Sequence, residues 1–463
     1  MKKLRGILEN QKLAIRICLA LMLAGGIMMS IMIPPWQTPD EYVHLQMIGE
    51  SLKNKSMADY LLQDMELDQD RIRFQYDEKI EIQLWKDAMI KVPDYTRTDC
   101  MPKGISLSVI KHLPAAAGIL LGILLHLPTI WVLELGELFA LLFYIGICGL
   151  ALKLMPVKKE ILLVIMAFPM SLQQAASLNY DSVLLPLSFL FTAYIFYMRH
   201  EKKQLGWKEA AYTLLLLFLV VYIKLPYVFL GLLVFLLPKE KIHLKMPGFE
   251  INGIWLRKWR IPLGIPMVLV IMAGIYVLRG NLYIQLVGGM VLEWRRTMYL
   301  AKETARVWGE YLFVSCIGQF GWLEAAVPFF FVVFSYVLML VLAVWGEAGE
   351  VPHRLKKRTR CWLWIVFGVL FVFIGMSMVN HTIMISLFGS EHAEGTYRVR
   401  EALYQIPYIG GLQGRYYLPF LALPFIALPE IKCRVKGKTW VAALYIMIGI
   451  IVSAGVLYRR YWG

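Results

Sequence analysis

Residues 34–44 decide the fold: Pro34-Pro35-Trp36-Gln37-Thr38-Pro39-Asp40-Glu41-Tyr42-Val43-His44 follows directly on the apolar run at 13–33. A run of that length is long enough to span a bilayer as a helix. Acidic residues fixed where a membrane helix meets water are costly to desolvate and are often functional. The stretch therefore predicts the end of a first membrane helix and a candidate site at Asp40 and Glu41.

The composition of the whole chain is that of a membrane protein. Of its 463 residues, 59% are hydrophobic and only 17% are charged, which is far too apolar for a soluble enzyme of this size. Apolar runs recur from residue 12 to residue 457. We therefore expect an all-α polytopic protein, a single membrane-embedded domain over residues 1–463 without a separate globular part.

The net charge of +15 would suit a nucleic-acid-binding protein, but its distribution argues against that function. The basic residues gather near the N-terminus and in short connectors around 153–159, 199–208, 239–260, 354–360 and 432–438. Short basic connectors between apolar runs are the positive-inside pattern, which orients a chain in a membrane. We therefore expect the lipid bilayer, and no nucleic acid, as a partner.

The same charges predict the number of membrane crossings. If the apolar stretch 107–127 crossed the membrane, every later basic connector would lie outside. If it instead dips into the membrane or lies along the outer surface, all of them are cytoplasmic, as is the N-terminus. We therefore predict about eleven crossings, at residues 13–33, 131–153, 160–177, 182–198, 209–224, 226–237, 261–279, 325–346, 361–384, 413–429 and 439–457.

Three long segments then face outward. The first external loop, 34–130, carries the juxtamembrane or re-entrant segment. The second, 280–324, contains the stretch 291–312, whose aromatic and basic residues are typical of an interfacial helix. The third is 385–412.

Polar side chains from distant parts of the chain fall at the outer ends of the predicted helices. They are Asp40, Glu41, His44, Glu134, Glu137, Gln173, Gln174, Ser177, Asn179, Asp181, Lys224, Tyr227, Asn380, His381, Gln413, Arg415, Tyr416 and Tyr417. Their convergence on one level predicts a site that opens to the exterior.

The two acids after the first helix have different structural explanations. Thr38 as N-cap, Pro39 at the first helical position and Glu41 at the third would form a capping box. Glu41 is then either catalytic or only a helix cap, whereas Asp40 is not needed to close the box. His44 lies four residues after Asp40 on the same helical face, where it either orients that carboxylate or makes a structural hydrogen bond.

The other candidates also have structural alternatives. Asn179 and Asp181 are residues that commonly begin helices. Lys224 is either a snorkelling anchor or an anion-binding group. Arg415 suits bidentate recognition of a phosphate.

Five motifs in this order resemble the bacterial DUF2142 membrane proteins over nearly the whole chain. They are Pro35-Trp36-Gln37-Thr38-Pro39-Asp40-Glu41-Tyr42-Val43-His44, Ser177-Leu178-Asn179-Tyr180-Asp181, Lys224-Leu225-Pro226-Tyr227, Phe320-Gly321-Trp322-Leu323-Glu324 and Gly411-Leu412-Gln413-Gly414-Arg415-Tyr416-Tyr417-Leu418-Pro419. That family in turn resembles the GT-C glycosyltransferases, whose members carry an acidic residue in the first external loop and use polyprenyl-phosphate sugars.

The resemblance implies a GT-C-like fold in the bacterial plasma membrane, with external juxtamembrane helices and an active site facing outside. It implies a polyprenyl-phosphate sugar as donor and an envelope glycan or glycolipid as acceptor. A second acidic position on the next outer turn of that superfamily matches Asp181. The chain has adjacent Asp40 and Glu41 in place of an Asp-x-Asp motif, so we assign no metal ligands and leave a requirement for a divalent cation open.

The implied reaction needs the phosphate bound, the anomeric carbon oriented and an acceptor proton removed. We expect Asp40 as the base, with Glu41 and Asp181 as the other catalytic candidates. The expected substrate-binding residues are His44, Asn179, Lys224, Tyr227, Arg415 and Tyr416.

The alternatives to an enzyme are a transporter or flippase of a lipid-linked saccharide or envelope polymer, and a non-catalytic scaffold. Transporters usually hold substrate near the bilayer midplane, whereas the polar residues here gather at the outer helix ends. The sequence therefore favours the enzyme.

Overall fold

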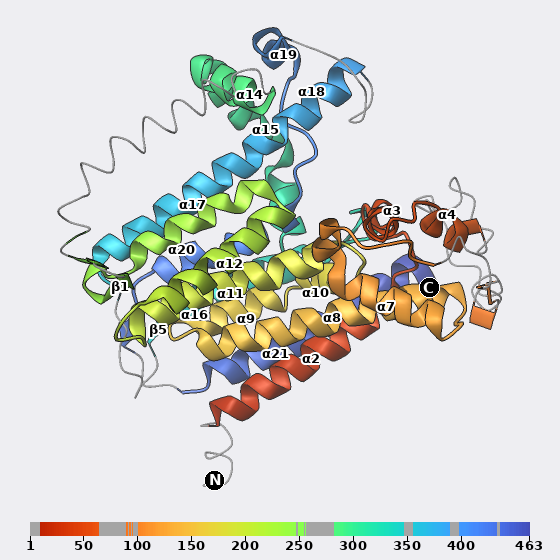
Figure 1. Cartoon of the computed structure of the whole chain (residues 1–463), viewed down its shortest axis with the longest axis horizontal. Helices are drawn as coiled ribbons and strands as arrows, with labels where there is room; N and C mark the ends of the chain where they lie inside the picture. The colour runs from red at the N-terminus through yellow and green to blue at the C-terminus, as the bar shows by residue number, and fades with distance from the viewer. Residues whose placement is uncertain are drawn as a thin grey trace.

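The computed structural model (Figure 1) describes residues 10–63, 89–90, 92–93, 95, 101–246, 249–253, 255, 282–346, 355–388, 398–432 and 436–463. The described part is mostly helical. Its α-helices are α2 (Gln11–Met32), α3 (Glu41–Ser51), α4 (Ser56–Gln63), α7 (Leu113–Leu124), α8 (Thr129–Leu154), α9 (Lys159–Met166), α10 (Pro169–Ala175), α11 (Asp181–His200), α12 (Trp207–Ile223), α14 (Leu282–Leu292), α15 (Trp294–Ser315), α16 (Phe329–Val344), α17 (Lys357–Ser377), α18 (Val379–Phe388), α19 (Val399–Gln405), α20 (Ala422–Ala427) and α21 (Lys438–Leu457).

Short helices of other types and three small sheets complete the described part. The 3₁₀-helices are η1 (Leu107–His112), η2 (Leu225–Leu236), η3 (Lys239–Lys241) and η4 (Gly414–Phe420), and η5 (Tyr458–Trp462) is a π-helix. The strands form the antiparallel pairs β1 (His243–Met246) with β2 (Phe249–Asn252) and β3 (Gln319–Phe320) with β4 (Ala325–Ala326), and the parallel pair β5 (Trp345–Gly346) with β6 (Ile431–Lys432).

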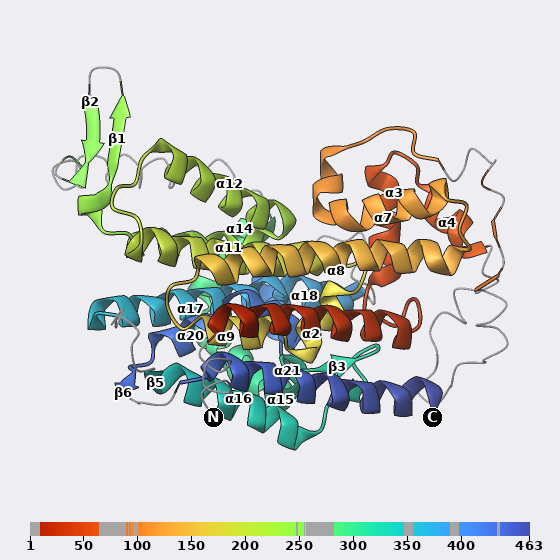
Figure 2. The same cartoon turned by 90° about the horizontal axis from the view of Figure 1, so that it is seen from below.

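The long helices run side by side and form one bundle (Figures 1 and 2). α2 packs against both α21 and α8, and α8 also packs against α11. α11 is the most enclosed of the long helices, since 89% of its most apolar window is buried inside the protein. Its sequence is apolar on all sides, as expected of a helix surrounded by other helices.

Six described segments are long and apolar enough to cross a membrane. They are Gln11–Met32, Leu107–Leu124, Thr129–Leu154, Asp181–His200, Lys357–Leu387 and Lys438–Trp462. Leu225–Leu236 and Phe329–Val344 are shorter apolar helices. The chain is therefore a multi-pass membrane protein, and five of the six segments coincide with predicted crossings.

Two predicted crossings are broken by proline. The predicted helix 160–177 is two helices, α9 and α10, because Pro169 cannot continue the first and pushes Phe168 into an extended conformation (ψ 141°). The predicted crossing 413–429 is divided into η4 and α20, with Pro419 in η4 and Pro424 in α20. The predicted crossing 261–279 lies outside the described residues.

The stretch 107–127, predicted not to cross, consists of η1 followed by α7, which packs along α8. Together η1 and α7 reach the length of a membrane span. The α-helical part alone has 12 residues, or about 18 Å, which is shorter than the hydrocarbon core of about 30 Å. The number of crossings and the orientation of the chain stay predictions.

The two ends of the bundle differ. α3, α4 and α7 lie at the end that also holds the C-terminus, and the β1–β2 hairpin lies at the opposite end in both views (Figures 1 and 2). A separate hydrophobic cluster joins α3 and α4 to α7 and α8 through residues such as Leu45, Met57, Ile119 and Val132. This packing fixes the segment that follows α2 against the bundle end.

Candidate functional site

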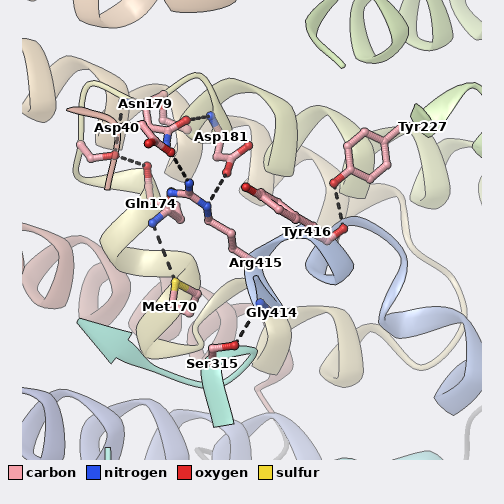
Figure 3. A network of polar contacts seen from close by, with 12 residues as sticks. Asp40, Met170, Gln174, Asn179, Asp181, Tyr227, Ser315, Gly414, Arg415 and Tyr416 are labelled. Atoms are coloured by element: carbon pink, nitrogen blue, oxygen red, sulfur yellow. Dashed lines mark hydrogen bonds and ion pairs between the residues drawn. The ribbon is translucent and has the colours of Figure 1, made fainter. Parts of the chain in front are cut away.

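The centre of the candidate site is the guanidinium of Arg415, which is 3% exposed and belongs to η4. Its Nη2 donates to Asp40 Oδ2 at 2.8 Å, and its Nε lies 3.7 Å from Asp181 Oδ2. Its Nη1 donates to Gln174 Oε1 at 3.0 Å. One buried cation therefore joins two acids from two separate loops, as Figure 3 shows.

Close backbone packing holds Arg415 in place. The hydroxyl of Ser315, at the end of α15, accepts a hydrogen bond from the N–H of Gly414 at 3.0 Å. The thiol of Cys316 donates to the Gly414 carbonyl at 3.3 Å. A Cβ on Gly414 would lie 2.2 Å from the Cys316 nitrogen and 2.4 Å from the Ser315 carbonyl carbon. Glycine is therefore required there because two stretches of backbone touch.

We expect Gly414→Ala to destabilise the protein by about 2–4 kcal/mol, because neither backbone can move aside cheaply. The matched control is Gly410→Ala in the same segment, where the nearest atom to a Cβ is Thr382 Oγ1 at 3.9 Å. Thermal unfolding in detergent measures both variants. Equal midpoints for the two would show that the Gly414 contact does not matter.

Asp40 is the N-cap of α3, in the left-handed region at φ 66°, and its side chain makes no capping hydrogen bond. A residue other than glycine with positive φ is uncommon, and aspartate tolerates it better than most. The side chain of Asp40 is 49% exposed. Asp40 is therefore turned away from its own helix, toward Arg415 and solvent.

The predicted capping box is wrong. α3 begins at Glu41 with Asp40 as its N-cap, so Glu41 occupies the first helical position and not the third after Thr38. Its carboxyl instead accepts hydrogen bonds from the N–H of Trp36 at 3.1 Å and of Leu178 at 3.3 Å. Glu41 is 2% exposed, and these two bonds connect the backbone segments at Trp36 and Leu178.

Asp181 begins α11 and is buried beside Arg415. Asn179 Oδ1 accepts a hydrogen bond from the Asp181 N–H at 3.0 Å (Figure 3). This local side-chain bond sets the start of the helix. Asn179 is therefore a structural partner of Asp181, although the N-cap of α11 is Tyr180 and not Asn179.

Lys224 and the tyrosines lie next to the cation. The Lys224 ammonium is 3.7 Å from the ring centroid of Tyr416 and 5.8 Å from that of Tyr180. The Tyr227 hydroxyl donates to the Tyr416 carbonyl at 2.8 Å. Tyr227 therefore fixes the backbone beside Arg415. The Arg415 Cζ atom is 5.6 Å from the centroid of the same Tyr416 ring, so both basic side chains lie against this ring.

His44 contacts His112, which the sequence did not single out. His44 Nδ1 and His112 Nε2 are 3.0 Å apart, and the His44 ring lies edge-on to Tyr180. Burial lowers the pKa of His44 well below its ordinary value, and His112 and Arg415 lower it further. A hydrogen bond between the two rings needs one nitrogen to carry the proton and the other to accept it, so the tautomers of His44 and His112 depend on each other. The only signal in the sequence was a polar residue inside the apolar stretch 107–127.

Two further groups of predicted polar residues lie around the site. Glu134 and Glu137 are on α8, and the carboxyl of Glu134 accepts a hydrogen bond from the Ser30 hydroxyl of α2. His381, on α18, packs against Gly411. In α15, Arg296 donates to the carbonyls of residues 403, 404 and 406. The predicted interfacial helix thus uses Arg296 to cap α19.

The described residues contain no group of three or more His, Cys, Asp or Glu side chains that could hold a metal ion. Asp40 and Asp181, two of the predicted catalytic acids, both face Arg415. A divalent cation between them would meet a guanidinium of like charge. In this arrangement the residues do not fit a metal, and we derive no step through one.

An apolar cavity of about 400 Å³ adjoins the site. Its walls come from α15, α16, α17 and the segment 409–421, with Gly309, Tyr336, Gly375 and Tyr417 among the lining residues. Leu412 and Tyr417, which flank the Arg415 segment, both line it. The backbone that presents Arg415 on one side therefore forms a wall of an apolar cavity on the other.

The family model "Predicted membrane protein (DUF2142)" matches residues 23–424. This range includes all five motifs quoted above, from the segment around Asp40 to that around Arg415. No curated protein and no solved structure matches the chain.

Proposed function

The chain belongs to the DUF2142 family of membrane proteins, and we propose that it is a GT-C-type glycosyltransferase that moves a sugar from a polyprenyl-phosphate donor to a cell-envelope acceptor. In this proposal the site faces the outside of a bacterial plasma membrane. The acceptor is an envelope glycan or glycolipid.

The observation that carries the proposal is the position of Arg415. Its guanidinium is buried between two carboxylates at the end of a helical bundle, while the adjacent backbone lines an apolar cavity. A donor made of a hydrocarbon chain and a phosphate needs these two environments side by side. Arginine recognises phosphate through its planar fork of donors.

The charges around Arg415 suggest how donor binding prepares the reaction. The Asp40 carboxylate accepts the hydrogen bond that Arg415 Nη2 donates, and its side chain is half exposed. A donor phosphate that takes this Nη2 releases the Asp40 carboxylate, which then accepts the proton of the acceptor hydroxyl. Asp181 stays buried against Nε and keeps the guanidinium oriented.

The atoms of the proposed transfer balance without a cofactor. The acceptor oxygen forms a bond to the anomeric carbon, the bond from that carbon to the phosphate oxygen breaks, and the proton goes to Asp40. The leaving phosphate gains negative charge, which Arg415 and Lys224 stabilise. Displacement from the opposite face inverts the anomeric centre.

The cavity suits the hydrocarbon part of the donor. Its volume of about 400 Å³ lies within the usual range for ligand pockets, about 300–1,000 Å³. The described lining residues are apolar apart from a few hydroxyls and a thiol, so a chain placed there leaves no buried charge unpaired. The cavity adjoins the polar site at Leu412 and Tyr417, the lining residues that flank Arg415 in the chain.

Filling the cavity should weaken donor binding without harming the fold. Gly375 lines the cavity and a Cβ there meets nothing within 4 Å, so Gly375→Leu extends a side chain into the open space. We expect about a tenfold or greater loss of polyprenyl-phosphate affinity, since about 1.4 kcal/mol of lost apolar contact is tenfold.

The matched control is Gly368→Leu, on the same helix and equally unobstructed, but not among the residues that line the cavity. Both variants replace a helical glycine by a better helix former. Competition binding in nanodiscs measures the affinities. An equal affinity in the two variants would remove the cavity from the donor site.

The function itself is tested with purified protein, radiolabelled polyprenyl-phosphate sugars and candidate envelope acceptors. Transfer of label to an acceptor, lost in Asp40→Asn, is the expected result. Translocation of the lipid-linked sugar across proteoliposomes without any transfer would favour a flippase.

A further inference from the structure

The motif at residues 320–324 contacts the loop that presents Asp40, although the proposed transfer does not use it. The indole N–H of Trp322 donates to the Trp36 carbonyl at 3.0 Å, and the Trp36 N–H donates to Glu41 at 3.1 Å. Trp36 is buried and has φ 70°, which is an outlier for a bulky residue. Both polar groups of its backbone are therefore bonded, and they keep a strained residue in place shortly before Asp40.

The other end of the same loop is bonded to η5. The indole N–H of Trp462 donates to the Met32 carbonyl at 3.0 Å, and Met32 is the last residue of α2. Two indoles from distant segments thus hold the carbonyls of Met32 and Trp36. The segment between them is fixed at both ends, and it leads directly to Asp40.

A buried ion pair connects the segments that carry the two indoles. Arg460 Nε, on η5, lies 3.1 Å from Glu324 Oε1, and the two side chains are 9% and 5% exposed. Breaking a buried ion pair is costly because it leaves a charge without a partner. The turn that carries Trp322 is therefore held in a fixed position relative to Trp462.

The shape of the turn between β3 and β4 depends on this pair. Gly321 has φ 63°, and a Cβ there would lie 2.1 Å from Glu324 Oε1 and 2.6 Å from the Tyr461 hydroxyl oxygen. Leu323 also has a positive φ, of 70°, and its carbonyl accepts a hydrogen bond from the Gln319 side-chain amide. Glycine at 321 therefore lets the carboxyl and the hydroxyl pack directly over the turn.

The same stretch of chain also supports the Arg415 side of the site. The N–H of Met170, in α10, donates to the Ile317 carbonyl at 2.9 Å. The same helix carries Gln174, which accepts a hydrogen bond from Arg415. The segment around β3 therefore contacts both the loop of Asp40 and the helix that holds its cationic partner.

We propose that Trp322, together with the Arg460–Glu324 pair, is a positioning residue that holds the loop of Asp40 so that its carboxylate faces Arg415. The role in sugar transfer rests on the proposed function, whereas the effect on the loop does not. Trp322 is 39% exposed, so water replaces its N–H when the donor is removed. The fold then survives, and the loop opens more often.

Hydrogen–deuterium exchange of the full-length protein in nanodiscs tests the effect on the loop without any ligand. Trp322→Phe keeps an aromatic ring and removes the N–H donor. We expect the Trp36 and Gln37 amides to exchange about threefold to tenfold faster, which is the contribution of one hydrogen bond to a local equilibrium. The Met170 amide, bonded to Ile317, should keep its protection.

The matched control is Trp207→Phe. Trp207 also donates its indole N–H to a backbone carbonyl, that of Lys245 at 2.8 Å, and it is 46% exposed. Lys245 belongs to β1, at the opposite end of the bundle (Figure 2). Exchange of the Trp36 and Gln37 amides in this control should equal that of wild type. Equal exchange in the two tryptophan variants would overturn the proposal.

A second variant tests whether the ion pair acts through Trp322. Arg460→Met combined with Glu324→Gln removes both charges at once, so neither is left buried alone. It should also speed exchange at Trp36, and adding Trp322→Phe should then cause no further increase, because both changes act on the same carbonyl. Effects that multiply in full would overturn the connection between the pair and Trp322.

The transfer assay tests the catalytic part of the proposal. Trp322→Phe should lower kcat about tenfold or more, since small displacements of a reacting group are costly. Its affinity for polyprenyl phosphate should not fall, because Arg415 and the cavity are unchanged. A wild-type kcat despite faster loop exchange would overturn this part. If exchange follows the prediction but the wild type transfers no sugar, the positioning of the loop stands and the proposed function fails.

Discussion

Replacing Arg415 with methionine is expected to abolish sugar transfer and to destabilise the fold. Asp40 and Asp181 then lie close together without the cation between them, and Asp181 is only 5% exposed. Removing one member of a buried ion pair costs about 3–5 kcal/mol. Removing a group that stabilises developing charge costs about 10²–10³-fold in rate. Thermal unfolding and the transfer assay measure the two effects.

A double variant separates the two effects of the Arg415 change. Arg415→Met leaves the buried Asp181 carboxylate without a cation, and Asp181→Asn removes that unpaired charge. The double variant should therefore recover most of the stability but none of the transfer. Arg398→Met is the control, because Arg398 is exposed and pairs with the exposed Glu401. Transfer at the wild-type rate by the stable double variant would remove Arg415 from the phosphate site.

Replacing Asp40 with asparagine is expected to reduce transfer by about 10²–10⁴-fold, the usual contribution of a general base. The fold should be nearly unaffected, since the side chain is 49% exposed and makes no capping bond. Affinity for polyprenyl phosphate should increase, because the neutral amide competes less well than a carboxylate for Arg415. The transfer rate and the lipid affinity thus change in opposite directions.

This opposite change distinguishes the proposed exchange from simple damage to the site. Asp59→Asn is the control, because Asp59 is a neighbouring acid on α4 at 3.5 Å from the Tyr42 hydroxyl. Wild-type transfer by Asp40→Asn would remove Asp40 as the base. Reduced transfer together with reduced lipid affinity would contradict the release of Asp40 by the donor phosphate.

The helices were largely predictable from the sequence. The runs 13–33, 131–153, 182–198 and 439–457 agree with α2, α8, α11 and α21 within a few residues. Long apolar runs are a local signal, because a helix satisfies its own backbone wherever it lies in a bilayer. The sequence contains the prolines that break the helix at Pro169 and within η4. The prediction nevertheless treated both stretches as continuous helices.

The partners of the site residues were much less predictable. Thr38, Pro39 and Glu41 match a capping box, yet Glu41 bonds Trp36 and Leu178 because α3 begins later than the pattern suggests. His112 drew no attention in an apolar stretch, although it is the hydrogen-bonding partner of His44. A local pattern does not reveal a competing partner from another loop.

The sequence by itself determined that this is a multi-pass helical membrane protein of the DUF2142 family, and it predicted that polar residues from distant segments converge on one site. Only the tertiary structure decided which of them meet. Asp40 and Arg415 are 375 residues apart, and their 2.8 Å contact depends on how α3, α11 and η4 pack. Hydropathy acts along each segment separately, whereas an ion pair between distant segments exists only once the whole bundle has closed around it.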